Sequence, residues 1–217
     1  MPLLPSNATP SHWPGSQLRR TLCLSLLAAL LPGTALLQGC GAVVVAGIAT
    51  GAAVAHDRRS STTVLADETI EIQAMHLQHE HPDIAAASNI SIDSYNYVVL
   101  LTGQARDREV SDRFAGLVAN LPKVKTVVNE VVVGPNADLT QSSNDLYLAS
   151  RCKFALTAVK IPGFDPLRVQ VVVSAGHAYL MGMVSKEEAD AAVEEVRYVP
   201  GIVQVVKLFE YTTPDPA

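Results

Sequence analysis

The sequence contains the same short pattern twice, and this internal repeat limits the folds that the chain can adopt. Each copy has an apolar run that closes on glycine, at residues 97–103 in the first copy and 178–182 in the second. A charged stretch with helical spacing follows each glycine, and a valine-rich stretch follows that. Self-similarity at a fixed period indicates two structural units of one kind.

The first copy is predicted to have the order α-β-β-α-β. Acidic residues suit a first helical turn at Asp67, and a polar break between two β-rich segments predicts a hairpin, with Gly103 ending its second strand. The predicted elements are helix 67–79, strands 89–93 and 95–101, helix 108–121 and strand 124–133. The helix over 108–121 is amphipathic, and its predicted inward residues are Val110, Phe114, Leu117 and Val118.

The second copy repeats this order with clearer signals. Ser143 or Asn144 can cap its first helix, Ser185 and Glu188 form a capping box for its second, and residues 200–201 (Pro-Gly) end that second helix. The predicted elements are helix 143–160, strands 169–174 and 178–181 around a turn at Gly176, a helix from Ser185 through Val196, and strand 203–211. The predicted fold class is α+β, with a small three-stranded sheet and two helices on one face in each copy.

An apolar segment near the N-terminus predicts export from the cytoplasm. Arg19 and Arg20 precede an uncharged stretch over residues 21–38, which ends in small residues before Cys40. Residues 37–40 (Leu-Gln-Gly-Cys) resemble the lipobox of bacterial lipoproteins, and that resemblance implies cleavage before Cys40 and acyl chains, palmitate among them, on this cysteine. Several acyl chains would make a permanent anchor, whereas one chain alone binds membranes only marginally. Residues 41–55 read as an apolar leader and residues 56–63 as a solvated linker.

Charge and cysteine content exclude several kinds of function. Removing residues 1–39 takes away two arginines and no acid, so the net charge falls from -5 to -7. Nucleic-acid binding needs clustered lysine and arginine, so no nucleic-acid partner is expected. Cys152 is the one cysteine after Cys40, which leaves no internal disulfide in the mature monomer.

The sequence predicts no enzyme, no cofactor and no metal. It lacks a nucleophile elbow, a phosphate loop and a zinc signature. His76, His79 and His81 with Glu80 resemble a metal cluster, but a solvated helix end explains them better, since metal sites need three or four converging ligands. His177 is predicted to lie in a hairpin turn as a structural residue.

Two αββαβ units behind a lipobox resemble the BON domains of dual-BON outer-membrane lipoproteins, which support envelope integrity and division. The stretch that carries this resemblance best runs from residues 143–147 (Ser-Asn-Asp-Leu-Tyr) through 151–153 (Arg-Cys-Lys) to Gly182. The resemblance implies a lipid-anchored protein at the periplasmic face of the outer membrane. The segments are then signal peptide 1–39, lipidated N-terminus and linker 40–66, first BON domain 67–134, linker 135–142, second BON domain 143–211 and tail 212–217.

The first helix of the second copy is the candidate binding element. If Leu148, Cys152, Leu156 and Val159 face inward, a neighbouring stripe faces out. Residues 143–160 hold three basic residues against one acid, which suits an anionic bilayer surface. In the resembling lipoproteins this helix binds anionic phospholipid, which implies the contact residues Tyr147, Arg151, Lys153 and Phe154.

An adaptor function remains open on the sequence. The same helix could pack against the first copy or against a partner in outer-membrane assembly, cell division or cell-wall hydrolysis.

Overall fold

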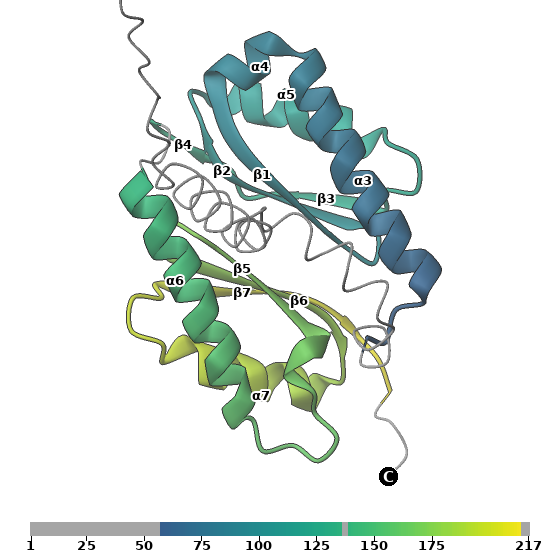
Figure 1. Ribbon diagram of the computed structural model, residues 1–217, viewed down its shortest axis with the longest axis vertical. Coiled ribbons are helices and arrows are strands. Elements are labelled where there is room, and N and C mark those ends of the chain that lie inside the picture. Colours follow the sequence, from purple (N-terminus) through teal and green to yellow (C-terminus); the bar gives the residue numbers. More distant parts are fainter. Residues whose placement is uncertain (1–56, 136–138, 214–217) are drawn as a thin grey trace, which may run out of the picture. The chain divides into compact units, whose positions relative to one another are not determined.

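The computed structural model describes residues 57–135 and 139–213. The predicted signal segment, Cys40 and the apolar leader lie outside these residues. Within the described ranges, no helix is long and apolar enough to cross a bilayer. Each of the two described stretches forms one repeat of helices and strands, which Figure 1 shows, and the predicted α+β class is confirmed.

The first repeat is built on a mixed sheet. Its elements are α3 (Ser61–Glu80), α4 (Pro82–Ala87), β1 (Ser88–Tyr95), β2 (Val98–Ala105), α5 (Arg108–Ala119), β3 (Thr126–Asn129) and β4 (Val132–Val133). Strand β2 pairs antiparallel with β1 and parallel with both β3 and β4. The single strand predicted over 124–133 is therefore wrong. It is interrupted at residues 130–131, where Val131 is buried in the core and its N–H donates to the side chain of Asn129.

The second repeat has the same topology with fewer interruptions. Its elements are α6 (Leu139–Ala155), the 3-10 turns Leu156–Ala158 and Pro166–Arg168, β5 (Val169–Ser174), β6 (His177–Val184), α7 (Lys186–Arg197) and β7 (Gln204–Tyr211). Strand β6 pairs antiparallel with β5 and parallel with β7. The predicted capping box is confirmed: Glu188 N donates to Ser185 Oγ at 3.1 Å, and Ser185 N donates to Glu188 Oε2 at 2.6 Å.

Several predicted boundaries are wrong, and at α3 the reason is a capping group that lies outside the periodic segment. Helix α3 begins six residues earlier than predicted, since the Ser60 hydroxyl accepts a hydrogen bond from Thr63 N. Helix α6 begins at Leu139, inside the predicted linker, and ends at Ala155, after which a 3-10 turn leads to the extended residue Val159. His177 is the first residue of β6 and not part of the turn.

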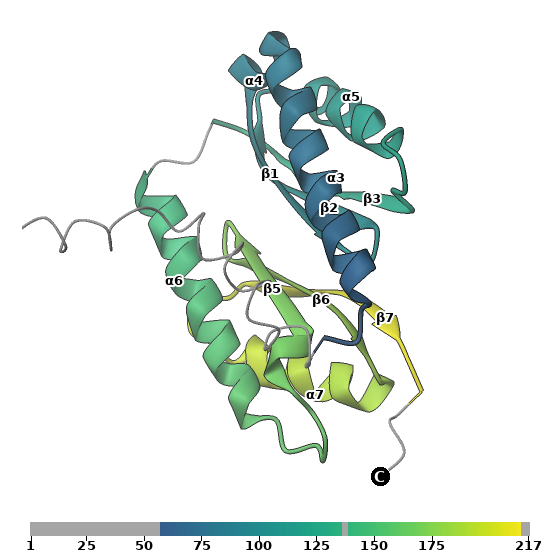
Figure 2. The same cartoon turned by 45° about the vertical axis from the view of Figure 1, so that its right-hand side comes forward.

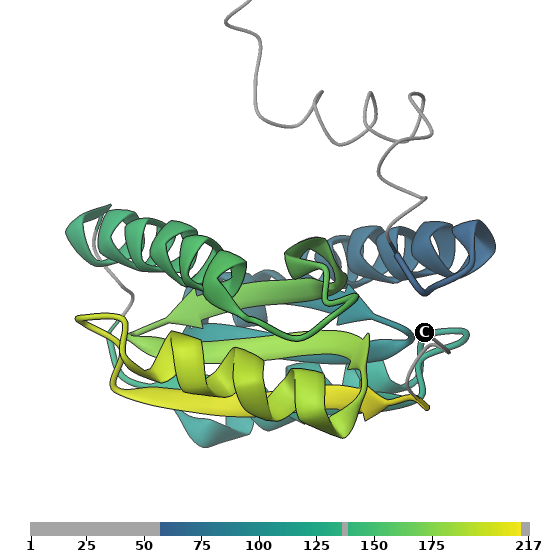
Figure 3. The same cartoon turned by 90° about the horizontal axis from the view of Figure 1, so that it is seen from below.

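The central strands β2 and β6 explain the two apolar runs of the sequence. Each strand is buried on both faces, so its residues need no polar alternation. On one face, β2 shares a core with α3 and α5 (Figure 2), and β6 shares a core with α6 and α7 (Figure 3). The opposite faces contribute to a third cluster that joins the two sheets, whose buried members are Tyr95, Leu100, Tyr179 and Met181.

Both hairpin turns are held by an aspartate from the first helix of their own repeat. The turn after β1 lies at Asn96 and Tyr97, which have φ of 49° and 69°, and not at the break predicted near residue 94. The carboxylate of Asp67 accepts hydrogen bonds from both of these backbone N–H groups, at 2.8 and 2.7 Å. Asp145 accepts from the turn residues 175 and 176 of the second repeat in the same way, at 2.9 and 3.2 Å.

The paired glycines lie inside strands, so the prediction that Gly103 ends its strand is wrong. A Cβ at Gly103 would lie 2.1 Å from the carbonyl oxygen of Asn89 on the neighbouring strand. A Cβ at Gly182 would lie 2.6 Å from the carbonyl oxygen of Arg168. Close approach of the paired backbone therefore requires glycine at both positions.

Candidate functional site

The outward face of α6 carries the aromatic residues that the sequence singles out. Cys152 and Leu156 are buried in the core of the second repeat, and Leu148 on the same side of the helix is 3% exposed, which fixes the rotation of the helix. On the outward face, the side chains of Tyr147 and Phe154 are 55% and 77% exposed. The predicted outward direction of this stripe is therefore confirmed.

Arg151 lies between these two rings along the helix. Its guanidinium donates a hydrogen bond to the Tyr147 hydroxyl at 3.1 Å and lies 5.8 Å from the centre of that ring. The pair fixes a positive charge beside an exposed aromatic ring, an arrangement that suits an interface between water and lipid.

A cavity of about 480 Å³ adjoins this stripe, between α6 and the C-terminal end of α7. The α6 wall holds Tyr147, Arg151 and Phe154, and the α7 wall holds Glu195 and Tyr198. Sequence reasoning missed Tyr198, which is 67% exposed and carries the Arg197 guanidinium 4.8 Å from its ring centre. An aromatic residue just before the Pro-Gly break at residues 200–201 is the signal that could have found it.

Lys153 lies apart from this cavity. Its side chain is exposed, but it does not line the space between α6 and α7. Its positive charge instead acts on the carboxylate of Asp93 in the first repeat. The structure therefore brings together three of the four predicted contact residues and places Lys153 on another side of the helix.

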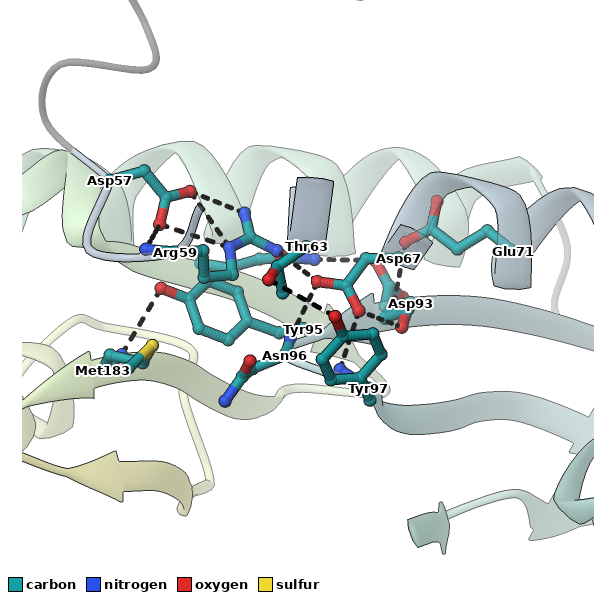
Figure 4. Close-up of polar contacts among 12 residues, drawn as sticks. Asp57, Arg59, Thr63, Asp67, Glu71, Asp93, Tyr95, Asn96, Tyr97 and Met183 are labelled. Carbon is teal, nitrogen blue, oxygen red and sulfur yellow. Dashed lines mark hydrogen bonds and ion pairs between the residues drawn. The ribbon is translucent and has the colours of Figure 1, made fainter. Parts of the chain in front are cut away.

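A polar cluster at the junction of the two repeats is the second candidate site, shown in Figure 4. Arg59 donates to Asp67 at 2.8 Å, pairs with Asp57 at 2.7 Å, and lies over the ring of Tyr95 at 3.8 Å from its centre. The Tyr95 hydroxyl accepts a hydrogen bond from Met183 N of the second repeat. Burial raises the pKa of Tyr95 to about 12, so its hydroxyl stays protonated.

Arg58 extends this cluster into the second repeat. It donates to the backbone oxygen of Met183 at 2.9 Å and to both carboxylate oxygens of Glu188, at 2.8 and 3.2 Å. Burial alone would raise the pKa of Glu188, but hydrogen bonds from Arg58 and Ser185 and the charge of Arg168 together lower it. The prediction that residues 56–63 form a solvated linker is therefore wrong for Arg58 and Arg59, which form ion pairs, while residues 61–63 belong to α3.

Two acidic groups beside this cluster have raised pKa values. Burial, together with the charges of Asp93, Asp67 and Glu68, raises the pKa of Glu71 to about 7, although Ser94 N donates to it at 2.7 Å. Burial also raises the pKa of Asp93, which accepts from Gln170 of the second repeat at 3.4 Å.

The histidines near the end of α3 have no ligand geometry. His76 Nε2 lies 3.2 Å from Glu80, and both side chains are more than half exposed. In the described part of the chain, no group of three or more histidine, cysteine, aspartate or glutamate side chains could hold a metal ion.

Comparison with known proteins places both repeats in one family. The BON domain model matches residues 68–135 and 144–213. The outer membrane lipoprotein DolP of Haemophilus influenzae is 33% identical over 189 residues, covering 87% of this chain and 96% of that protein. A 21 kDa hemolysin of Actinobacillus pleuropneumoniae is 30% identical over 155 residues, covering 71% of this chain and 79% of that protein.

A solved structure of CdsD, a structural protein of the type III secretion system of Chlamydia trachomatis, is 15% identical and covers 69% of this chain and 92% of its own. Its TM-score of 0.23 is too low to support an inference. The two BON matches and the near full-length likeness to DolP confirm the predicted family and the predicted place at the outer membrane. The chain therefore belongs to the family of BON-domain outer-membrane lipoproteins.

Proposed function

We propose that this lipoprotein binds anionic phospholipid at the periplasmic face of the outer membrane through α6 of its second BON domain. The binding supports outer-membrane integrity and cell division and involves no enzymatic step. The observation that carries the proposal is the outward stripe of Tyr147, Arg151 and Phe154, in which two aromatic rings flank one arginine.

Two physical terms support this binding. Each exposed ring loses contact with water when it enters the headgroup region, and full burial of a phenylalanine side chain contributes about 1.5–3 kcal/mol. Each basic residue near an anionic surface contributes about 1 kcal/mol, a term that salt screens. Helix α6 carries Arg151 and Lys153 against Asp145, whose carboxylate is engaged by the β5–β6 turn. Arg151 is the central cation, and Lys153 contributes from the side of the stripe.

The test is binding of the non-acylated fragment 57–217 to vesicles. Both hydrophobic cores and the Arg58–Glu188 contact lie within this fragment, whereas Cys40 and the apolar leader do not. We expect binding to vesicles that contain an anionic phospholipid, and weaker binding to purely zwitterionic vesicles.

Charge-reversal variants distinguish the contribution of Arg151 to vesicle binding from that of Lys153. Arg151→Glu replaces an attraction by a repulsion and should weaken binding by about tenfold or more, at about 1 kcal/mol for each of the two changes. Lys153→Glu changes the net charge equally but should weaken binding less, because Lys153 lies off the stripe. Melting curves by circular dichroism check that both variants stay folded.

Equal binding to anionic and zwitterionic vesicles, or full binding by folded Arg151→Glu, would contradict lipid docking by α6. Either result would favour the adaptor function, in which the same exposed stripe packs against a protein of outer-membrane assembly, division or cell-wall hydrolysis.

Lipidation of Cys40 is a separate proposal that rests on the lipobox resemblance. Serine has no thiol to carry the first acyl chain, so Cys40→Ser should leave an uncleaved or misplaced precursor. Mass spectrometry of the wild-type mature protein should find acyl chains on Cys40, and an unmodified cysteine there would contradict the proposal.

A further inference from the structure

Exposed aromatic side chains are concentrated around the cavity between α6 and α7. Among the described residues, the large exposed aromatics are Tyr147, Phe154, Tyr198 and Tyr211. Three of these four line this cavity, and Tyr211 on β7 does not. Exposed aromatic rings are unfavourable in water, so their gathering at one concave place indicates a binding surface.

The two tyrosines of the cavity are matched in their chemistry. Tyr147 on α6 has Arg151 beside its ring, and Tyr198 at the end of α7 has Arg197 beside its own, at 4.8 Å from the ring centre. Arginine provides a fork of N–H donors that fits phosphate oxygens, and a tyrosine ring sits well at headgroup depth. Of these two arginines, Arg151 lines the cavity, whereas Arg197 does not and pairs with Glu194 at 3.0 Å.

We infer that the end of α7 is the second half of the lipid-docking surface, and that the cavity between α6 and α7 receives the phosphate headgroup of one bilayer phospholipid. The inference rests on the proposed lipid binding and extends it to residues that the α6 stripe does not contain. Tyr147, Phe154 and Tyr198 enter the headgroup region around that lipid, and Arg151 donates to its phosphate.

Glu195 places a negative charge in the cavity wall. It lines the same space as Arg151, and neither residue forms an ion pair within the described part of the chain. A carboxylate there repels the phosphate of the bound lipid and so weakens its binding. Removing the Glu195 charge should therefore strengthen binding to anionic vesicles, although the α6 stripe is unchanged.

The experiment measures vesicle binding of fragment 57–217 with six variants, two of which, Tyr147→Ala and Phe154→Ala, test the α6 stripe. Tyr198→Ala is compared with Tyr211→Ala, since both residues are exposed tyrosines and only Tyr198 lines the cavity. Glu195→Gln is compared with Glu187→Gln, an exposed acid in the first turn of the same helix. At about 1.5 Å per residue, Glu187 lies about 12 Å further along the axis, more than the Debye length of about 8 Å.

We expect Tyr147→Ala, Phe154→Ala and Tyr198→Ala each to weaken binding severalfold, and Tyr211→Ala to leave it unchanged. Glu195→Gln should strengthen binding to vesicles of phosphatidylglycerol and phosphatidylethanolamine by about fivefold, the effect of one charge at an anionic surface. Glu187→Gln should have little effect.

The failures of the inference and of the proposed function are distinct. If Tyr147→Ala and Phe154→Ala weaken binding but Tyr198→Ala behaves like Tyr211→Ala, the surface does not include α7 and the inference is wrong. Equal effects of Glu195→Gln and Glu187→Gln on binding would contradict the binding of a lipid headgroup in this cavity. If none of the three cavity aromatics affects binding, the proposed lipid docking itself is wrong.

Discussion

Arg58 and Glu188 lie 130 residues apart in the chain and form a two-point ion pair, with distances of 2.8 and 3.2 Å. The side chains are 15% and 6% exposed, so the pair is largely removed from water. Arg59, the next residue, binds Asp67 of the first domain. Two adjacent arginines therefore fasten the segment before α3 to both BON domains.

Loss of this pair should destabilise the protein. Arg58→Ala leaves the Glu188 carboxylate buried without its main cation, which should lower the free energy of unfolding by about 2–3 kcal/mol. Lys186→Ala is the matched control, since the Lys186–Asp190 pair is exposed and should contribute less than about 1 kcal/mol. Urea unfolding measures both. Equal effects of the two variants would show that Arg58 does not hold the junction.

Glu71 should make stability depend on pH. Its pKa is raised to about 7 in the folded state, against an ordinary value of 4.5, so between these values the folded protein binds more protons than the unfolded chain. The contribution of Glu71 to the free energy of unfolding is then fully present below pH 4.5 and is lost as the pH rises through 7.

Glu71→Gln removes the group that binds this proton and keeps an oxygen that can accept a hydrogen bond from Ser94 N. The variant should melt at a higher temperature than wild type at pH 8 and show no such gain at pH 4.5. A gain of the same size at both pH values would contradict titration of Glu71 as the cause.

Replacing Gly103 and Gly116 by alanine should change the stability of the protein in opposite directions. Gly103 has φ of 104° and an alanine Cβ would meet the Asn89 backbone, so Gly103→Ala should cost about 3 kcal/mol or more. Gly116 lies exposed in α5 with open space around it, so Gly116→Ala should stabilise by up to about 1 kcal/mol. Thermal melts decide this, and a tolerated Gly103→Ala would refute the close approach of β1 and β2.

Cys152 should be unreactive in the folded protein. It is fully buried, and burial raises the pKa of its thiol to about 11, so almost no thiolate forms near neutral pH. A thiol reagent should label the native fragment slowly and the urea-unfolded fragment fast. Rapid native labelling would mean that α6 is rotated, and the outward direction of Tyr147 and Phe154 would then be wrong.

The part of the fold that is encoded locally could be predicted from the sequence. The order of elements in each repeat, the inward faces of α5 and α6, and the capping box at Ser185 follow from residues only a few positions apart. The pair of glycines at 103 and 182 also marked the repeat, although their reason is contact with a neighbouring strand. The outward stripe of α6 was predictable because it is the complement of a clear apolar face.

Tertiary structure decided the rest, because those contacts join distant segments. Asp67 looked like an ordinary first-turn acid, but it lies buried in α3 and holds the turn at Asn96 and Tyr97. Arg58 binds Glu188, 130 residues further along the chain, and Tyr198 reaches the α6 cavity only through the packing of α7. Helical and strand periodicity records which face of an element is buried, whereas the identity of the surface packed against that face depends on the assembled fold.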